Sequence, residues 1–565
     1  MGRKTRERHA AWRAAEVGGP LPKTGAARVC AVYPGPYRVA MANLGYQWLL
    51  RALSDAGFAV ARVVWPEDDL LAEAERDKLT AIDDDRPASD AAAWFVSLSF
   101  ENDLPRLAGL LRLAGLATRA GDRQYDDPLI VAGGVVPMLN PEPTADLVDL
   151  CLLGEGDAAL SPFLEYLKQN DPRDREHFLR GLRDIPGAYV GRFYRPHYRQ
   201  DGRLERIEAL DGFPERVTLP REKTIDPLRL RTHLRAPDAE FGDALLVETA
   251  KGCVQRCRFC AAGHLFLPFR PAPPPGELPD LSQTAVGLVG ANVSGHGKLA
   301  DWIRAAGDSR VTLSSIRVGA LDDAQWRALA DKGLAAAAIA PEAGSERLRR
   351  VCNKPLDDER IIGEVRRAVG AGLRNLKLYF LIGLPTETPA DIDAIIALTL
   401  RCRDAAMDAW KLKGRAGKIV VSVNPFVPKP HTPFQWEAFG EVKELKAKVK
   451  TIREGLRRTP NVEVQAESLD AAALQAILSV GDRRIGALIR RVDREGIRPA
   501  LRFWKEQADF YLNRPRAYHD LLPWDHLDVG VTRQYLIDQH QAALHADVSP
   551  PCFSVAGCRL CGVCK

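Results

Sequence analysis

Apolar runs and helical periods alternate along the first third of the chain. Five short apolar runs stand at residues 29–33, 58–65, 94–100, 129–132 and 147–153. Between them, apolar residues recur at helical spacing, as in residues 41–56. Alternating strands and helices predict a parallel, doubly wound sheet of the Rossmann or flavodoxin-like type. We place this α/β domain at residues 27–182 and a proline-containing, charged connector at residues 183–240.

The same alternation resumes after the connector. Six further apolar runs stand at residues 244–248, 285–289, 311–316, 335–340, 376–381 and 419–423. Six strand–helix units predict an open, partial (β/α)6 barrel, which we place at residues 241–437, and barrels of this kind carry their chemistry at the carboxyl ends of the strands. The remainder, residues 438–565, is mainly helical in pattern and ends in a run rich in cysteine.

Composition describes an ordinary soluble α/β protein. The 565 residues are 46% hydrophobic and 27% charged, and this length suggests about three domains. No apolar run approaches the roughly 18 residues of a membrane span, so no membrane association is expected. A net charge of +5 is weak for this length and does not argue for nucleic acid. The basic start, residues 1–8, lacks the apolar core of a secretory signal and is expected to be a solvated tail.

Cysteine usage changes this picture. The 11 cysteines cluster in two places, which favours metal ligation in a reducing cytoplasm over disulfides. Cys253, Cys257 and Cys260 follow the first barrel strand at a spacing of C-x3-C-x2-C. Three thiolates can each hold one iron of a 4Fe–4S cluster and leave the fourth iron open to a small molecule. A structural zinc knuckle is the alternative, although zinc sites more often use two separated C-x2-C pairs.

This motif resembles that of radical S-adenosylmethionine (SAM) enzymes, in which SAM chelates the open iron. The resemblance implies that SAM is bound by the turns that end the later strands. Pro341–Ser345 resembles the family's Pro-Glu-Ala-Gly-Ser turn, and residues 383–388 resemble its Gly-Leu-Pro-x-Glu-Thr turn. The implied cofactor-binding residues are Gly290, Asn292, Ser294, Arg317, Glu342 and Gly383.

The chain departs from the family pattern in two places. The turn after residue 289 has Gly290 but lacks the second glycine and the glutamate that contact the SAM amino group, so Asn292 and Ser294 are the candidates for that contact. The prolines of residues 271–276 cannot continue a helix, so the long helix that usually follows the cluster loop is expected to be short or missing.

The first third resembles the cobalamin-binding-type domain that precedes some radical SAM cores. The resemblance rests on residues 34–45, on Gly133–Gly134 and on Gly154–Gly156, whose glycines are expected where the backbone approaches a flat or anionic ligand. The D-x-H-x-x-G motif, whose histidine ligates cobalt in other corrinoid proteins, is absent. Two interpretations stay open: a cobalamin site, or a domain of the same fold that binds nothing or docks substrate.

A second cysteine set ends the chain. Cys552, Cys558, Cys561 and Cys564 form C-x5-C-x2-C-x2-C, a complete ligand set for a second iron–sulfur cluster or for structural zinc. The four isolated cysteines are expected to be buried, inert thiols. They are Cys30, Cys151, Cys352 and Cys402.

The resemblance implies an enzyme that cleaves SAM reductively to a 5′-deoxyadenosyl radical, with an electron donor such as flavodoxin or ferredoxin. The leading hypothesis is a cobalamin-dependent methyltransferase. The first alternative is a cobalamin-free radical SAM enzyme that uses the terminal cysteines as an auxiliary cluster for sulfur insertion or electron relay. The second alternative is a metal-binding scaffold without enzymatic activity.

Overall fold

The amino-terminal sheet has six strands in the order β2-β1-β3-β4-β5-β6. They are β1 (Arg28–Tyr33), β2 (Ala59–Val64), β3 (Ala93–Ser97), β4 (Leu129–Gly133), β5 (Leu150–Leu152) and β6 (Ala188–Tyr189). The first five pair in parallel and β6 is antiparallel. The order 2-1-3-4-5 is that of the flavodoxin-like fold, so the predicted doubly wound sheet is confirmed. Every residue of β2 and β3 is buried, as expected for a sheet covered by helices on both faces.

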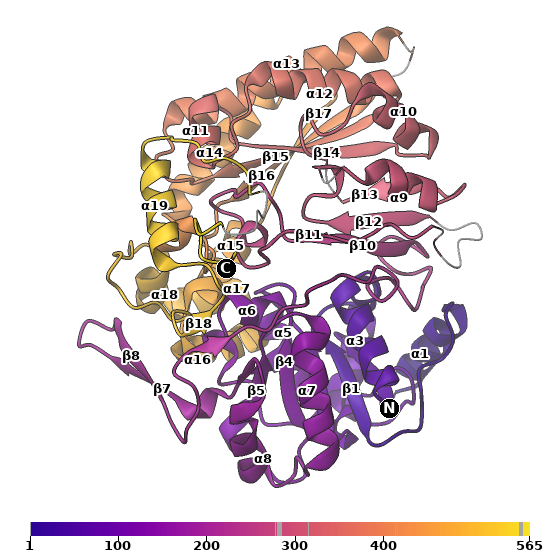
Figure 1. Ribbon diagram of the computed structural model, residues 1–565, viewed down its shortest axis with the longest axis vertical. Coiled ribbons are helices and arrows are strands. Elements are labelled where there is room, and N and C mark those ends of the chain that lie inside the picture. The colour runs from indigo at the N-terminus through magenta and orange to yellow at the C-terminus, as the bar shows by residue number, and fades with distance from the viewer. Residues whose placement is uncertain are drawn as a thin grey trace.

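Helices α3 (Leu44–Asp55), α5 (Asp103–Leu113) and α7 (Gly156–Gln169) connect these strands. Helices α3 and α7 lie in front of the sheet in Figure 1. The structure is a computed structural model and describes residues 2–276, 278, 285–295, 297–314, 316–412, 414, 416–552 and 558–564.

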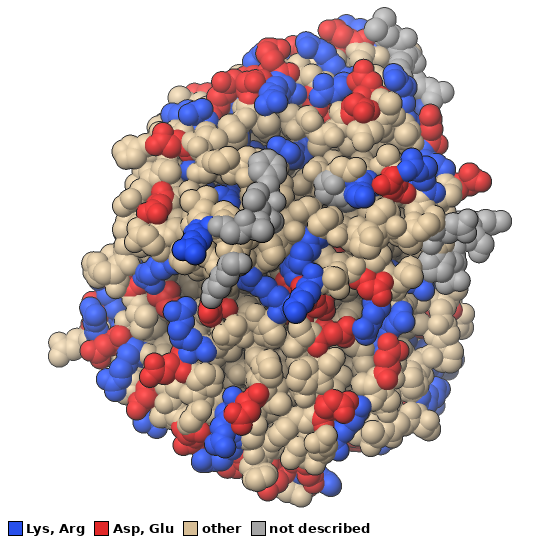
Figure 2. Space-filling view, viewed as in Figure 1, with Lys and Arg blue, Asp and Glu red and all other residues tan. Residues whose placement is uncertain are grey.

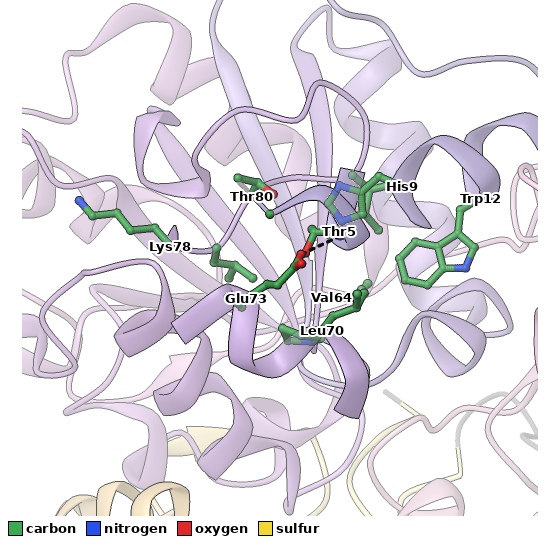
Figure 3. Close-up of a pocket in the computed structure, with 13 residues that line it drawn as sticks. Thr5, His9, Trp12, Val64, Leu70, Glu73, Lys78 and Thr80 are labelled. Carbon is green, nitrogen blue, oxygen red and sulfur yellow. Dashed lines mark hydrogen bonds between the residues drawn. The ribbon is translucent and has the colours of Figure 1, made fainter. Parts of the chain in front are cut away.

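The start of the chain is a helix and not the expected solvated tail. Helix α1 (Arg3–Ala15) packs on the sheet edge because Trp12 is 3% exposed and stacks on Tyr37 with ring centroids 4.1 Å apart. Glu73 accepts hydrogen bonds from the Thr5 N–H at 2.9 Å and from its hydroxyl at 2.8 Å. Figure 3 shows this contact in a small pocket between α1 and the elements around β2.

The six predicted core strands are all present, but they divide into two sheets. They are β10 (Leu245–Lys251), β12 (Val286–Gly290), β13 (Val311–Leu313), β14 (Ala336–Glu342), β15 (Asn375–Ile382) and β16 (Lys418–Pro425). One sheet has the order β11-β10-β12-β13 and the other β14-β15-β16-β17. Among the described residues, which omit 315, one parallel bridge, Ile316 to Ile339, joins them. Since β13 spans three residues, it offers too short an edge for a full ladder, and the described residues form no continuous barrel sheet.

Two strands in these sheets were not predicted. β11 (Arg270–Pro271) lies antiparallel at the edge of β10, and β17 (Val462–Ala466) extends the second sheet from within the region expected to be helical. The described residues between Cys260 and β12, which omit 277 and 279–284, form no α-helix, and the expectation of a short or missing helix there stays a prediction.

The carboxyl-terminal region is otherwise helical, as predicted. Its helices are α14 (Val442–Leu456), α15 (Leu469–Val480), α16 (Gly486–Glu495), α17 (Ile497–Phe503), α18 (Lys505–Leu512) and α19 (Arg533–Leu544). This region bridges the two halves of the molecule, since α16 packs on α5 of the amino-terminal domain and α19 packs beside the core (Figure 1). The aromatic loop at residues 524–531 docks within the chain, because β18 (Leu527–Asp528) pairs with β9 (Val217–Thr218) of the connector.

Charged side chains of both signs are interspersed over most of the face shown in Figure 2. None of the described helices has the length and apolar character needed to cross a bilayer.

Candidate metal and cofactor site

The loop that carries Cys253, Cys257 and Cys260 leaves the carboxyl end of β10. Gly252 opens the loop with a φ of +76°, and a Cβ atom there would lie 2.4 Å from the carbonyl oxygen of Phe266. Only glycine fits both conditions. The N–H of Gln255 donates to the Cys253 sulfur at 3.5 Å, and backbone N–H groups donate to the Cys260 sulfur. Such hydrogen bonds favour the thiolate, which is the form that ligates iron.

The three thiols are close enough to act on one another electrostatically. Burial raises the pKa of all three above the usual value, and that of Cys257 to about 12. A bound metal reverses this effect, because a coordinating thiol loses its proton. No three Cys, His, Asp or Glu side chains in the described part of the chain converge as ligands of one ion do. A 4Fe–4S cluster places each thiolate on a different iron, and the donor set on this loop fits that chemistry.

An ion pair lies beside the cysteine loop. Lys354 Nζ is 2.9 Å from Oε1 of Glu342, and the two side chains are 19% and 14% exposed. Glu342 ends β14 with a φ of +69°, and its carboxylate acts electrostatically on the thiol of Cys257. Burial opposes the charge of Lys354, but Glu342 and the thiols outweigh it, so the pKa of Lys354 is raised. Glu342 thus lies beside the cysteine loop, and its contact to SAM stays a prediction. Lys354 was missed because nothing in its sequence context signals it.

The other predicted SAM contacts divide into two groups. Gly290, Asn292 and Ser294 follow β12, and the Ser294 hydroxyl accepts a hydrogen bond from the Arg317 N–H at 3.0 Å. The Arg317 side chain is exposed. Desolvation lowers the pKa of its guanidinium, and the thiols of Cys253 and Cys257 partly oppose this lowering. This group therefore borders the cysteine loop.

Gly383 belongs to a separate turn. Its φ is +80°, and its N–H donates to both carboxylate oxygens of Glu387 at 3.0 Å. Asp391 ties this turn to the one after β14, because it accepts from Thr388 at 2.8 Å and from Arg347 at 2.6 Å and contacts the Ser345 hydroxyl. The structure gives no direct contact between Gly383 and the cysteine loop.

The carboxyl-terminal cysteines lie against the same loop. The N–H of Cys552 donates to the carbonyl oxygen of Val254 at 2.7 Å. Asn353 reinforces this junction, since its amide donates to the Arg256 carbonyl at 3.2 Å and accepts from the Ser549 N–H at 2.8 Å. No periodicity or motif in the sequence points to Asn353 or to this contact.

A cavity of about 300 Å³ separates the cysteine-bearing sheet from the amino-terminal sheet. Its lower wall is the carboxyl edge of β3, β4 and β5, and its upper wall comes from β10 and the loop after it. The lining residues include Trp48, Phe95, Val131, Met138, Leu152 and Leu160, with Glu248 and Lys251 on the opposite wall. The predicted glycine segments, Gly133–Gly134 and Gly154–Gly156, also line it.

The structure gives a different reason for two of these glycines. A Cβ on Gly134, at a φ of +103°, would lie 2.4 Å from the carbonyl oxygen of Leu98, and one on Gly154, at +140°, would lie 2.7 Å from Pro220. Packing within the chain therefore requires glycine at both positions, whether or not a ligand approaches them.

Comparisons with known proteins agree with this architecture. Residues 45–191 match a family model described as "Radical SAM proteins, N-terminal", and residues 247–399 match "Radical SAM superfamily". The chain is 29% identical over 410 residues to uncharacterized protein MJ0966 of Methanocaldococcus jannaschii, a match that covers 70% of this chain and 78% of the relative.

Solved structures give more distant matches. The cobalamin-dependent SAM radical enzyme OxsB is 15% identical with a TM-score of 0.41, over 67% of this chain and about half (52%) of its own length. SuiB of Streptococcus suis, solved with SAM bound, is 13% identical with a TM-score of 0.29, over 40% of this chain and 51% of its own. One family model covers most of the amino-terminal domain and the other covers most of the core. Together they show that the chain belongs to the radical SAM superfamily of enzymes, whose members use a 4Fe–4S cluster and SAM.

Proposed function

We propose that this protein is a cobalamin-dependent radical SAM methyltransferase that acts on an unactivated carbon. The cavity between the two sheets carries this proposal, because Glu248 and Lys251 of β10, the strand that leads into the cysteine loop, and the carboxyl edge of a flavodoxin-like sheet lie on opposite walls of one space. In open α/β sheets, ligands bind beyond the carboxyl ends of the strands. A cofactor bound at this edge would therefore face the strand that leads into the cysteine loop.

Cys253, Cys257 and Cys260 would hold the 4Fe–4S cluster, which supplies one electron to the SAM sulfonium and so yields methionine and a 5′-deoxyadenosyl radical. Arg317 would pair with the SAM carboxylate, and the nearness of its guanidinium to the thiol of Cys253 supports this role. Asn292 offers an amide nitrogen that is buried and has no hydrogen-bond partner among the described residues.

The lining of the cavity suits a large, mainly apolar ring. Cobalamin, when bound, would supply the methyl group. The lining contains no histidine among the residues that the structure describes, so the cobalt would have no histidine ligand from this wall. Glu248, whose pKa is raised by burial, and Lys251 stand on the core side and can hydrogen-bond the polar rim of such a ring.

One observation supports the auxiliary cluster that the cobalamin-free alternative requires. The terminal cysteines contact the cysteine loop directly, and that contact suits an auxiliary cluster whether or not cobalamin binds. Under this alternative the cavity receives the substrate instead of a cofactor.

Anaerobic expression with added hydroxocobalamin separates these functions. The proposal predicts extractable corrinoid at close to one per chain, together with release of 5′-deoxyadenosine from SAM under reducing conditions. Deoxyadenosine without corrinoid would favour the cobalamin-free enzyme. Absence of both corrinoid and 5′-deoxyadenosine would favour a metal-binding scaffold without enzymatic activity.

A further inference from the structure

The terminal cysteines form a compact set at the surface. Cys552 and Cys561 are 5% and 3% exposed, whereas Cys558 and Cys564 are half-buried beside Leu560, which is 55% exposed. The thiols of Cys552, Cys558 and Cys561 are all near enough to Cys564 to act on it electrostatically. Residues 553–557 lie outside the described part of the chain. One edge of the set is thus buried and the other faces solvent.

The buried edge is joined to the cysteine loop in two ways. The Cys552 N–H donates to the Val254 carbonyl, one residue from Cys253. The Arg256 guanidinium hydrogen-bonds to the thiol of Cys552 and lies 5.7 Å from the centre of the Tyr535 ring. The connection from one cysteine set to the other therefore passes through a few covalent bonds and one short hydrogen bond.

The other face of the set is held by the segment before α19. The N–H of Thr532 donates to the carbonyl oxygen of Cys561 at 2.9 Å, and Gly562 adopts a φ of +90° beside it. A Cβ on Gly562 would lie 2.6 Å from the Thr532 side chain, so glycine is required. The chain thus holds the middle of the C-x2-C-x2-C run, at Cys561 and Gly562, although the run itself has little regular structure.

From this arrangement we infer that Cys552, Cys558, Cys561 and Cys564 ligate a second iron–sulfur cluster that relays electrons to the cluster on the Cys253 loop. Four thiolates are a complete ligand set for such a cluster. The inference rests on the proposed function, because it needs the first cluster as the electron acceptor.

The relay moves one electron at a time. A low-potential one-electron donor, such as reduced flavodoxin, is oxidised by one electron at the exposed edge, near Cys558 and Cys564. The second cluster is reduced and then reoxidised as it passes the same electron past Cys552 to the first cluster. No atom or proton is transferred, so the electron count closes at each step.

Metal content tests whether the second centre exists. The chain is reconstituted anaerobically with iron and sulfide as wild type, as the variant C253A/C257A/C260A and as the variant C558A/C561A/C564A. Each variant is expected to keep about half of the wild-type iron and sulfide and no zinc. Cys402→Ala, which removes a buried thiol from α13 (Pro389–Leu412), is the control and should keep all of it. Zinc, or no metal, in folded C253A/C257A/C260A protein would overturn the inference even if wild type cleaves SAM.

The rate of electron entry tests the relay. With reduced flavodoxin as donor, stopped-flow bleaching of the first cluster is expected to be at least ten times slower in C558A/C561A/C564A than in wild type or in C402A. An unchanged rate would overturn the relay. If the triple variant fails to fold, Cys558→Ser replaces it, with the same slower bleaching expected and the same unchanged rate counting against the relay.

Discussion

Cys552 and Val254, which stand about half the chain length apart in the sequence, are joined by a backbone hydrogen bond of 2.7 Å. Val254 lies between the first and second cysteines of the C-x3-C-x2-C loop, and Cys552 is the first cysteine of the terminal set. The two cysteine-rich segments are therefore one structural unit. We expect the residues that follow α19, as well as β10, to hold the cysteine loop in its conformation.

Asn353 is the clearest test of that unit. Its side chain is 3% exposed and joins Arg256 of the loop to Ser549 of the terminal segment. Asn353→Ala leaves the buried Arg256 carbonyl and the half-buried Ser549 N–H without this partner, which costs about 1–3 kcal/mol of unfolding free energy. Faster loss of iron to a chelator should accompany this loss of stability.

Asn461→Ala is the matched control for that substitution. Asn461 has a positive φ, of 66°, and its side chain donates to the Gly417 carbonyl at 2.8 Å. It lies beside β17, away from the cysteine loop. The control should lower stability in urea without faster iron release. Equal iron release from the two variants would contradict a specific role for Asn353.

Lys354 is expected to set the reduction potential of the loop cluster. Its ammonium group is largely buried between Glu342 and the thiols, where a positive charge stabilises the added electron. Lys354→Met should shift the midpoint potential to more negative values, by tens of millivolts in order of magnitude. A redox titration followed by electron paramagnetic resonance (EPR) measures the shift. The control is Lys418→Met. Lys418 lies at the amino end of β16 and pairs with Glu463, so this substitution should leave the potential unchanged.

Gly133 tests the occupant of the cavity. An added Cβ there meets only the Leu152 carbonyl oxygen, at 3.8 Å, and the residue needs no left-handed backbone. Gly133→Leu should therefore place its side chain in the cavity without unfolding the domain, and weaken hydroxocobalamin binding by at least about tenfold, or 1.4 kcal/mol. Gly133→Ala should bind nearly as wild type. Undiminished binding by the leucine variant, in an absorbance titration, would remove cobalamin from this cavity.

Asp103 gives the stability of the amino-terminal domain a predictable pH dependence. Burial raises its pKa from 3.8 to about 7, so the folded chain holds a proton that the unfolded chain releases. Its stabilising contribution is complete below about pH 4 and is lost as pH rises to about 7. The loss is at most about 4 kcal/mol. Asp103→Asn should flatten the pH dependence of urea unfolding between pH 4 and 7, and an unchanged profile would contradict this assignment.

Much of the fold follows from apolar patterning. The five parallel strands from β1 to β5 and the six core strands lie within a few residues of their predicted positions, because buried strands leave strong apolar runs. The division of the core into two sheets could not be predicted, since it depends on the short edge of β13. Helix α1 was missed because its hydrophobic anchor is the single pair Trp12 and Tyr37, which no periodicity reveals.

Site residues could be predicted from the sequence only where they belong to a local motif with a recognisable spacing. Cys253, Cys257 and Cys260 form a local motif, and Glu342 sits in a recognisable turn, so both could be named from the sequence. Lys354 and Asn353 act through contacts that the fold creates between distant segments. Asn292 and Arg317 border the cysteine loop, while Gly383 occupies a neighbouring turn, and their contacts to SAM stay predictions.

The central claim is that a cluster held by Cys253, Cys257 and Cys260 leaves one iron open to SAM. The most direct measurement is the EPR spectrum of the reduced, reconstituted protein recorded with and without SAM. We predict that SAM changes the g values of the wild-type signal and that C253A/C257A/C260A shows no SAM-dependent change. A wild-type spectrum that SAM leaves unaltered would contradict the open iron and, with it, the proposed chemistry.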